Sequence, residues 1–196
     1  MPGVHAVVLA AGASTRMGAH KLLLPLGGEP IVRRTVREVC AAGFDGVLVV
    51  VGHEHEQVMT ALDGLPVRSA VNAGFAAGMG SSFRTAIEHL GDADAAMFAL
   101  ADQPFLTSRE YRRVLETHRL SRHPIVSVRY GDVTAPPHLF TRALFGELSQ
   151  LEHGARPVLQ RHRDDMTVLA FPPELLQDID TPEDYERAKM LDSPGT

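Results

Sequence analysis

Short, almost uninterrupted hydrophobic runs recur along the 196-residue chain, and longer segments that mix hydrophobic and polar residues separate them. The runs cover residues 6–10, 46–52, 66–71, 95–102, 124–128 and 166–171. Most of them lack the in-out alternation of a strand with one solvent-exposed face, and this is typical of parallel strands covered on both faces. The pattern therefore predicts a buried, mostly parallel sheet.

The mixed segments between the runs carry the spacing of amphipathic helices. In residues 31–42 one hydrophobic stripe recurs at helical intervals, formed by Ile31, Val32, Thr35, Val36, Val39 and Cys40. Residues 81–90 and 108–120 show the same spacing, with Ser81 and Ser108 at the N-cap positions. Strands that alternate with helices predict an α/β fold with right-handed crossovers. Because no repeat or linker interrupts the pattern, we expect one domain over residues 1–196.

Composition narrows the classes of partner. The formal net charge of −5 argues against a broad nucleic-acid-binding surface. Cys40 is the single cysteine, so no intramolecular disulfide can form, and a reducing compartment suits the chain. The first hydrophobic run is too short to span a membrane, and no charged leader precedes it. We therefore expect a cytoplasmic protein without nucleic-acid or membrane partners.

The loop after the first predicted strand joins small residues to two cations, Arg16 and Lys21. Ligands of parallel α/β sheets bind at the carboxyl ends of the strands, where this loop would lie. The loop lacks both the P-loop spacing and the G-x-G-x-x-G fingerprint. Its backbone N–H groups and its cations are suited to holding phosphate. The alternative is a plain strand-to-helix turn with two surface cations.

Other candidate groups follow later hydrophobic runs. Residues 72–87 combine glycines with paired serines and form either a ligand-binding loop or a flexible loop with an N-cap. Asp102 ends the run of residues 95–102. A carboxylate at this position has three alternative roles: a Mg²⁺ ligand, a helix cap or a salt-bridge partner. Asp178 and Asp180 are two residues apart, so an extended chain would place both on one face. Residues 181–184 have the pattern of a capped helix start.

Several histidines have weaker interpretations. His53 and His55 lack a further ligand set, which favours a polar loop that opens a helix over a metal site. The segment of residues 131–137 breaks the alternation and predicts a functional or edge loop. His138 follows two prolines in this loop, and we expect it to precede a helix. No serine–histidine–aspartate order or reactive cysteine setting supports a hydrolase.

The stretch of residues 9–36 resembles the signature of the molybdenum cofactor nucleotidyltransferase family, with its MobA-like NTP transferase domain. The matching positions are Ala10, Ala11, Gly12, Arg16, Met17, Gly18, Lys21 and Pro25. The resemblance implies a three-layer Rossmann-like sandwich of the nucleotide-diphospho-sugar transferase type. It also implies that the loop wraps the triphosphate of a nucleotide.

The resemblance assigns roles residue by residue. It implies catalytic roles for Arg16, Lys21 and Asp102, and Mg²⁺ bound by Asp102 together with Asp178 or Asp180. It also implies, on weaker support, that Pro104, His138 and Arg156 contact the acceptor. His153 lies three residues before Arg156 and is a further candidate. The implied nucleotide-binding residues are Leu9, Ala10, Ala11, Gly12, Ser14, Arg16, Lys21, Asn72, Gly78, Gly80, Ser81 and Ser82.

The cytidylyltransferase branch of this family fits best, because the loop reads L-A-A-G and residues 102–104 read D-Q-P. That branch transfers CMP from CTP to the phosphate of molybdopterin, and a molybdoenzyme or its maturation chaperone is an implied partner. The alternatives are another NTP or phosphorylated acceptor, such as a sugar 1-phosphate, and a non-catalytic nucleotide-binding protein that delivers cofactor. An NAD-dependent oxidoreductase would share the sheet but is disfavoured by the missing second glycine.

Overall fold

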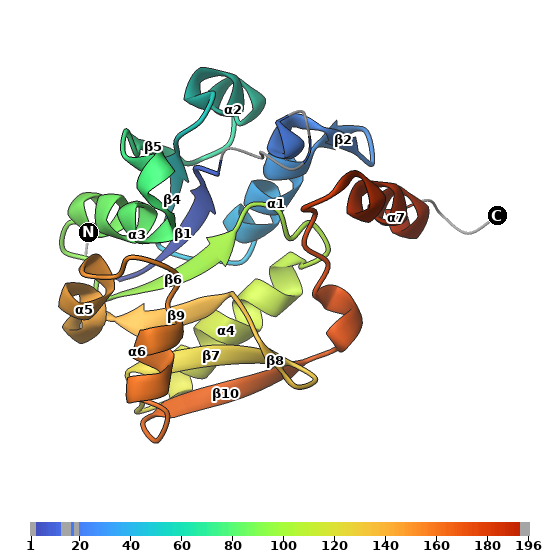
Figure 1. The fold of residues 1–196 in the computed structure, drawn as a ribbon. Coiled ribbons are helices and arrows are strands. Elements are labelled where there is room, and N and C mark those ends of the chain that lie inside the picture. Colours follow the sequence, from blue (N-terminus) through green and yellow to red (C-terminus); the bar gives the residue numbers. More distant parts are fainter. Residues whose placement is uncertain (1–2, 13–16, 18–19, 193–196) are drawn as a thin grey trace.

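The computed structural model describes residues 3–12, 17 and 20–192, and it centres on one mixed β-sheet (Figure 1). The strand order is β10-β7-β9-β6-β1-β4-β5, with β8 paired to β7, and β2 and β3 form a separate small hairpin. The strands are β1 (Val4–Ala10), β2 (Pro25–Leu26), β3 (Glu29–Pro30), β4 (Gly46–Val51), β5 (Arg68–Val71), β6 (Ala95–Leu100), β7 (Ile125–Tyr130), β8 (Val133–Thr134), β9 (His138–Thr141) and β10 (Met166–Phe171).

The sheet is mostly parallel, as the hydrophobic runs predict, and each run contains or overlaps one of its strands. Strand β1 lies in the middle, where Val7 faces Leu48 of β4 and Phe98 of β6 in register. Successive side chains of a strand point to opposite faces, and in β1 both sets are buried. This is why these strands read as continuous hydrophobic runs.

Helices cover both faces of the sheet and give three layers (Figure 1). Helices α1, α2, α4 and α7 contribute to the core on one face, whereas α3, α5 and α6 contribute to the core on the other. None of the helices in the described ranges combines the length and the hydropathy needed to cross a membrane. The helices are α1 (Ile31–Cys40), α2 (His55–Ala61), α3 (Met79–His89), α4 (Ser108–Leu120), α5 (Phe145–Ser149), α6 (Arg156–Arg161) and α7 (Pro182–Asp192).

The segment around His138 differs from the prediction. His138 does not precede a helix directly but begins β9, which pairs antiparallel with both β6 and β7. The preceding loop forms the β7–β8 hairpin, in which Tyr130 pairs with Val133. The antiparallel strand β9 lies between a group of four parallel strands, β6-β1-β4-β5, and a parallel pair, β7 and β10.

The two predicted serine N-caps are also wrong. Helix α4 is capped one residue earlier, by Thr107, which forms a capping box with Glu110. Helix α3 begins at Met79 after Gly78, so Ser81 lies inside its first turn. The start of α7 agrees with the prediction, because Thr181 and Asp184 bond to each other's backbone N–H groups.

Gly80 allows a close approach between α3 and the chain that leads to α6. Its N–H donates to the carbonyl of Glu152 at 3.1 Å. A Cβ atom at this position would lie 1.9 Å from the carbonyl oxygen of Leu151. The space beside Gly80 is therefore filled by the protein's own backbone.

We expect Gly80→Ala to destabilise the fold by at least about 2 kcal/mol, because the backbone at Leu151 must shift. Gly146→Ala is the matched control, since it lies in α5 with nothing within 4 Å of the added Cβ atom. The control gains up to ~1 kcal/mol from helix propensity. Urea unfolding measures both changes, and equal stability of the two variants would contradict this packing.

Candidate active site

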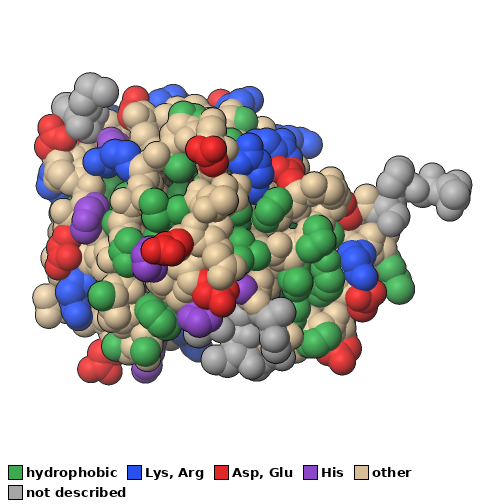
Figure 2. Space-filling model, turned by 90° about the horizontal axis from the view of Figure 1, so that it is seen from above, with side chains coloured by type: hydrophobic (Ala, Val, Ile, Leu, Met, Phe, Trp, Pro, Cys, Tyr) green, Lys and Arg blue, Asp and Glu red, His purple; other side chains and the backbone are tan. Residues whose placement is uncertain are grey.

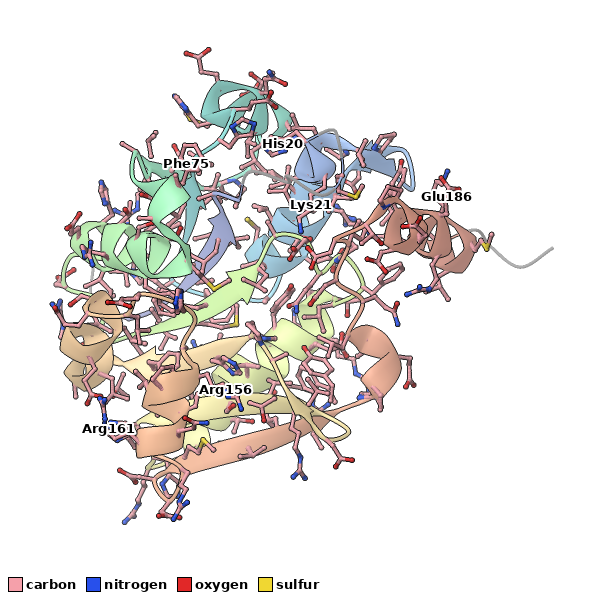
Figure 3. The ribbon with its side chains drawn as sticks, in the orientation of Figure 1. His20, Lys21, Phe75, Arg156, Arg161 and Glu186 are labelled. Atoms are coloured by element: carbon pink, nitrogen blue, oxygen red, sulfur yellow. The ribbon has the colours of Figure 1, made fainter. Side chains whose placement is uncertain are left out.

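The loops that follow β1, β4, β5 and β6 meet at one edge of the sheet. His20 and Lys21 lie beside this edge, at the start of the short 3₁₀-helix Lys21–Leu23 (Figure 3). Figure 2 looks down on the molecule from this side and shows histidine and acidic side chains interspersed with hydrophobic ones. The edge therefore offers both charge and stacking surfaces, as expected of a ligand site in a parallel sheet.

The ammonium group of Lys21 lies between two carboxylates. Its Nζ is 2.5 Å from Oδ2 of Asp102 and 2.7 Å from Oδ1 of Asp180. The Lys21 side chain is only 12% exposed. Burial alone would lower the pKa of Lys21, but the charges and hydrogen bonds of Asp102 and Asp180 raise it above its ordinary value. Lys21 is therefore a fixed cation at neutral pH.

The two candidate aspartates near the C-terminus play different parts. Asp180 meets Asp102 through Lys21, whereas Asp178 accepts a hydrogen bond from Nε2 of Gln103 at 2.9 Å. Between them, the N–H of Ile179 donates to the carbonyl of Asp102 at 3.3 Å. Sequence reasoning left the choice of metal ligand open, and this geometry favours Asp180 as the partner of Asp102.

The Asp102–Asp180 pair suits a divalent cation. Oδ1 of Asp102 is buried and has no hydrogen-bond partner in the part of the chain that the structure describes. A carboxylate oxygen of this kind is a hard ligand of the type that Mg²⁺ prefers. The described residues contain no group of three or more histidine, cysteine or acidic residues arranged for a metal. A cation held here would need water and substrate phosphates to complete its coordination.

The predicted residues after β5 form an internal network. Nδ2 of Asn72 donates to Oγ of Ser81 at 2.8 Å and to Oγ of Ser82 at 3.0 Å. Oδ1 of Asn72 accepts from the N–H of Gly74, and Ser81 in turn donates to the carbonyl of Gly78. The network fixes the loop against the start of α3. The nucleotide-binding role of these residues stays a prediction.

An aromatic cluster at the same edge was missed by sequence reasoning. The rings of His20 and His53 stack nearly parallel with centroids 5.6 Å apart, and Phe75 lies 5.9 Å from His53 (Figure 3). Gly52 makes this possible, because a Cβ there would lie 2.8 Å from both Ala11 and Phe75. No spacing rule links these residues, since each follows a different strand. As expected, this segment opens a helix: His53 lies in the loop, and His55 is the first residue of α2.

A large cleft opens beside this edge on the side of α3 and α6. It encloses about 1150 Å³, with hydrophobic walls that include Phe83 and Phe98. Those two rings lie 4.7 Å apart. Arg156 and Arg163 also line it. Leu100, the last residue of β6, lines it as well and lies two residues before Asp102 in the sequence. The cleft is thus hydrophobic with cationic groups.

The predicted acceptor residues do not all lie in this cleft. Arg156 lies on α6 (Figure 3) and lines the cleft. His153 and His138 line it as well. Burial lowers the pKa of His138 to about 3, so this ring is neutral, and it bonds with Oγ of Ser127. Pro104 is buried instead on the side of α1, where its carbonyl accepts from Arg34. An acceptor contact through Pro104 therefore has no support from the cleft.

The structure describes the first residues of the loop that is predicted to bind phosphate. Leu9 and Ala10 end β1 and Ala11 follows it, all three in buried positions, and Gly12 is exposed beyond them. The predicted phosphate ligands Ser14 and Arg16 lie outside the described residues. Their roles stay predictions from the sequence.

Residues 6–166 match the family model of the MobA-like NTP transferase domain, and the chain belongs to this nucleotidyltransferase family. The resemblance found in the sequence is therefore confirmed. The fold also agrees with that of a solved nucleotidyl transferase of Methanothermobacter thermautotrophicus. The superposition covers 97% of this chain and 97% of that chain, with a TM-score of 0.85 and 27% sequence identity.

Curated relatives share only part of their length with this chain. A nicotine blue oxidoreductase of Paenarthrobacter nicotinovorans is 33% identical over 137 residues, which are 69% of this chain and 66% of the relative. A bifunctional protein GlmU of Geotalea uraniireducens is 32% identical over 140 residues, 69% of this chain and 30% of the relative. The chain thus spans less than two thirds of either relative.

A solved structure extends the comparison to nearly the whole chain. The Rv0371c protein of Mycobacterium tuberculosis is 28% identical, with a TM-score of 0.85 over 96% of this chain and 97% of that one. The same protein has been solved in complex with manganese, with a TM-score of 0.81 and 27% identity over 96% of this chain and 98% of that one. Divalent metal binding is therefore known in a structural relative.

We expect Lys21→Met to raise the affinity for Mn²⁺ in the absence of nucleotide by about tenfold or more. The reason is that the ammonium occupies the space between Asp102 and Asp180 and repels a second cation there. Lys189→Met is the control, since Lys189 is an exposed lysine on α7. Electron paramagnetic resonance of free Mn²⁺ measures the affinity. An unchanged affinity in Lys21→Met would show that the carboxylate pair does not bind the metal.

Proposed function

We propose that the protein transfers CMP from CTP to the phosphate of molybdopterin, or of its metal-loaded form, and releases pyrophosphate. The observation that carries the proposal is the Lys21 ammonium held between Asp102 and Asp180 at the strand-end edge, beside a hydrophobic cleft. Membership of the MobA-like NTP transferase family supports the reaction class. The particular acceptor and base rest on further arguments.

The charges of the site suit an attack of one phosphate on another. The acceptor's phosphate oxygen attacks the α-phosphorus of the nucleotide, the bond to the bridging oxygen breaks, and pyrophosphate leaves. The attacking oxygen already carries negative charge, so no protein base is needed. Lys21 exchanges its bonds to carboxylates for bonds to triphosphate oxygens and stabilises the charge on the departing pyrophosphate. Arg16 would act in the same way.

Asp102 and Asp180 would hold Mg²⁺, and the unpartnered Oδ1 of Asp102 supports this assignment. When bound, Mg²⁺ supplies charge neutralisation on the phosphate oxygens. The two carboxylates fix the position of that charge relative to Lys21. Their remaining task is to keep the triphosphate in one orientation, since positioning accounts for much of the rate in such reactions.

The cleft supports a flat, partly aromatic acceptor such as a pterin. The hydrophobic walls, which the buried rings of Phe83 and Phe98 back, offer burial to a fused ring. Arg156 and Arg163 can pair with an anionic group on the same molecule. A sugar 1-phosphate would leave most of this hydrophobic surface without a partner. The shape and chemistry of the cleft therefore favour molybdopterin among phosphorylated acceptors.

The preference for cytosine rests on the loop of residues 9–12 rather than on Gln103. The side chain of Gln103 is 1% exposed and bonds to Asp178, so the middle residue of the D-Q-P motif does not face a base. The L-A-A-G loop, which resembles that of cytidylyltransferases, remains the feature that supports CTP.

The relative named nicotine blue oxidoreductase favours one second candidate, an oxidoreductase, for which we infer a nicotinamide cofactor. The hydrophobic cleft would hold its organic substrate. The two candidates differ in their cofactor. Tight binding of NADPH, measured by its fluorescence, without binding of any nucleoside triphosphate would support the oxidoreductase.

Pyrophosphate release with Mg²⁺ and each of the four nucleoside triphosphates, with and without molybdopterin, tests the proposal. We expect release only with CTP plus the pterin. Release with a sugar 1-phosphate instead would assign a different acceptor, and CTP binding without release would indicate a cofactor-delivery protein.

We expect Lys21→Met and Asp102→Asn each to lower kcat by about 10²-fold or more, with Lys189→Met unchanged as the control.

We expect Arg156→Ala to raise KM for the pterin by about tenfold with little change in KM for CTP, because Arg156 lines the cleft. Arg161→Ala is the matched control on α6, since Arg161 pairs with Glu147 instead (Figure 3). Steady-state kinetics with each substrate varied in turn give both values. An equal rise in the KM for CTP would place Arg156 at the nucleotide instead.

A further inference from the structure

We propose that Gln103 and Asp178 form a positioning pair that holds Asp180 against Lys21 and Asp102. The consequence for metal binding rests on the proposed function, but the positioning itself does not. Neither residue contacts the reacting groups in this proposal. They act by docking the segment of residues 178–180 onto the end of the sheet.

The pair joins parts of the chain that are 75 positions apart. Gln103 directly follows Asp102, and Asp178 lies two residues before Asp180. The Nε2 of Gln103 donates to Oδ1 of Asp178 at 2.9 Å. A single hydrogen bond thus links the neighbours of the two carboxylates that share Lys21.

Two further contacts make this docking specific. The N–H of Ile179 donates to the carbonyl of Asp102 at 3.3 Å, and the Ile179 side chain is buried in the core. On the far side, the N–H of Asp180 donates to Asp184 in the first turn of α7. Asp180 is therefore held between the sheet and α7.

Burial explains why the amide of Gln103 depends on Asp178. The Gln103 side chain is 1% exposed, and its Oε1 has no hydrogen-bond partner within the described residues. Burying an amide is unfavourable unless it forms hydrogen bonds, and removal of its partner carries the full desolvation cost. Asp178 supplies that bond. Loss of either member is therefore expected to loosen residues 178–180.

The competing explanation is that Asp178 binds the metal directly, and one substitution separates the two. Asp178→Asn keeps the oxygen that accepts from Gln103 but loses the negative charge that makes a carboxylate a strong ligand of a divalent cation. Asp178→Ala loses both. Gln103→Leu removes the donor at similar size, and Gln150→Leu is the matched control because Gln150 is exposed at the end of α5.

Hydrogen exchange of the Ile179 amide and Mn²⁺ affinity measured with a non-hydrolysable CTP analogue test the pair. We expect Gln103→Leu and Asp178→Ala to speed exchange at least about threefold and to weaken Mn²⁺ binding about three- to tenfold, while the protein stays folded and its melting temperature falls by roughly 10 °C or less. Asp178→Asn and Gln150→Leu should stay within about twofold of the wild type. In an Asp180→Asn background, Gln103→Leu should weaken Mn²⁺ binding no further, because it acts through Asp180.

Unchanged exchange of the Ile179 amide in Gln103→Leu overturns the proposal. Loss of Mn²⁺ in Asp178→Asn as large as in Asp180→Asn also overturns it, because Asp178 would then be a ligand. A wild-type protein that binds no Mn²⁺ contradicts the proposed function instead. In that case the exchange rates alone still decide whether Gln103 and Asp178 position the segment.

Discussion

The ammonium of Lys21, held between the carboxylates of Asp102 and Asp180, is the interaction on which the rest of the site depends. The two carboxylates are 81 and 159 positions away from Lys21 in the chain. A largely buried charge is tolerable only when it is paired, so these three segments must converge for the fold to be stable. Helix α7 completes the arrangement, since Tyr185 bonds to the carbonyl of Pro25 and Asp192 pairs with Arg34.

Charged and hydrophobic surfaces adjoin at the sheet. Asp102 follows β6 and meets Lys21, whereas Leu9 of β1, Leu100 of β6, His138 of β9 and Met166 of β10 line the hydrophobic cleft. The antiparallel strand β9 joins the two parallel groups of the sheet. This arrangement suits a reaction between a highly charged donor and an acceptor with a large apolar body. It also explains how one fold can serve relatives whose names denote different activities.

Much of the fold follows from the sequence because buried parallel strands leave a strong hydrophobic pattern. Strand β9 was missed because its four residues, which follow two prolines, carry little hydrophobic pattern of their own. The helix caps were predicted near their true positions: Thr107 lies one residue before Ser108, and Gly78 lies three residues before Ser81. Motifs in the sequence singled out Lys21 and Asp102, and the structure brings these two residues together, while their catalytic roles stay predictions. The different contacts of Asp178 and Asp180 were not, because they depend on Gln103, which lies far away in the chain.

The most direct test of the central claim follows the α-phosphate of CTP. The protein is incubated with Mg²⁺, molybdopterin and CTP labelled with ³²P at either the α- or the γ-position. Nucleotidyl transfer at the Lys21 site predicts that the α-label appears in the pterin product and the γ-label in pyrophosphate. Labelled inorganic phosphate from the γ-position, or no incorporation of the α-label with any nucleotide or acceptor, would contradict the account.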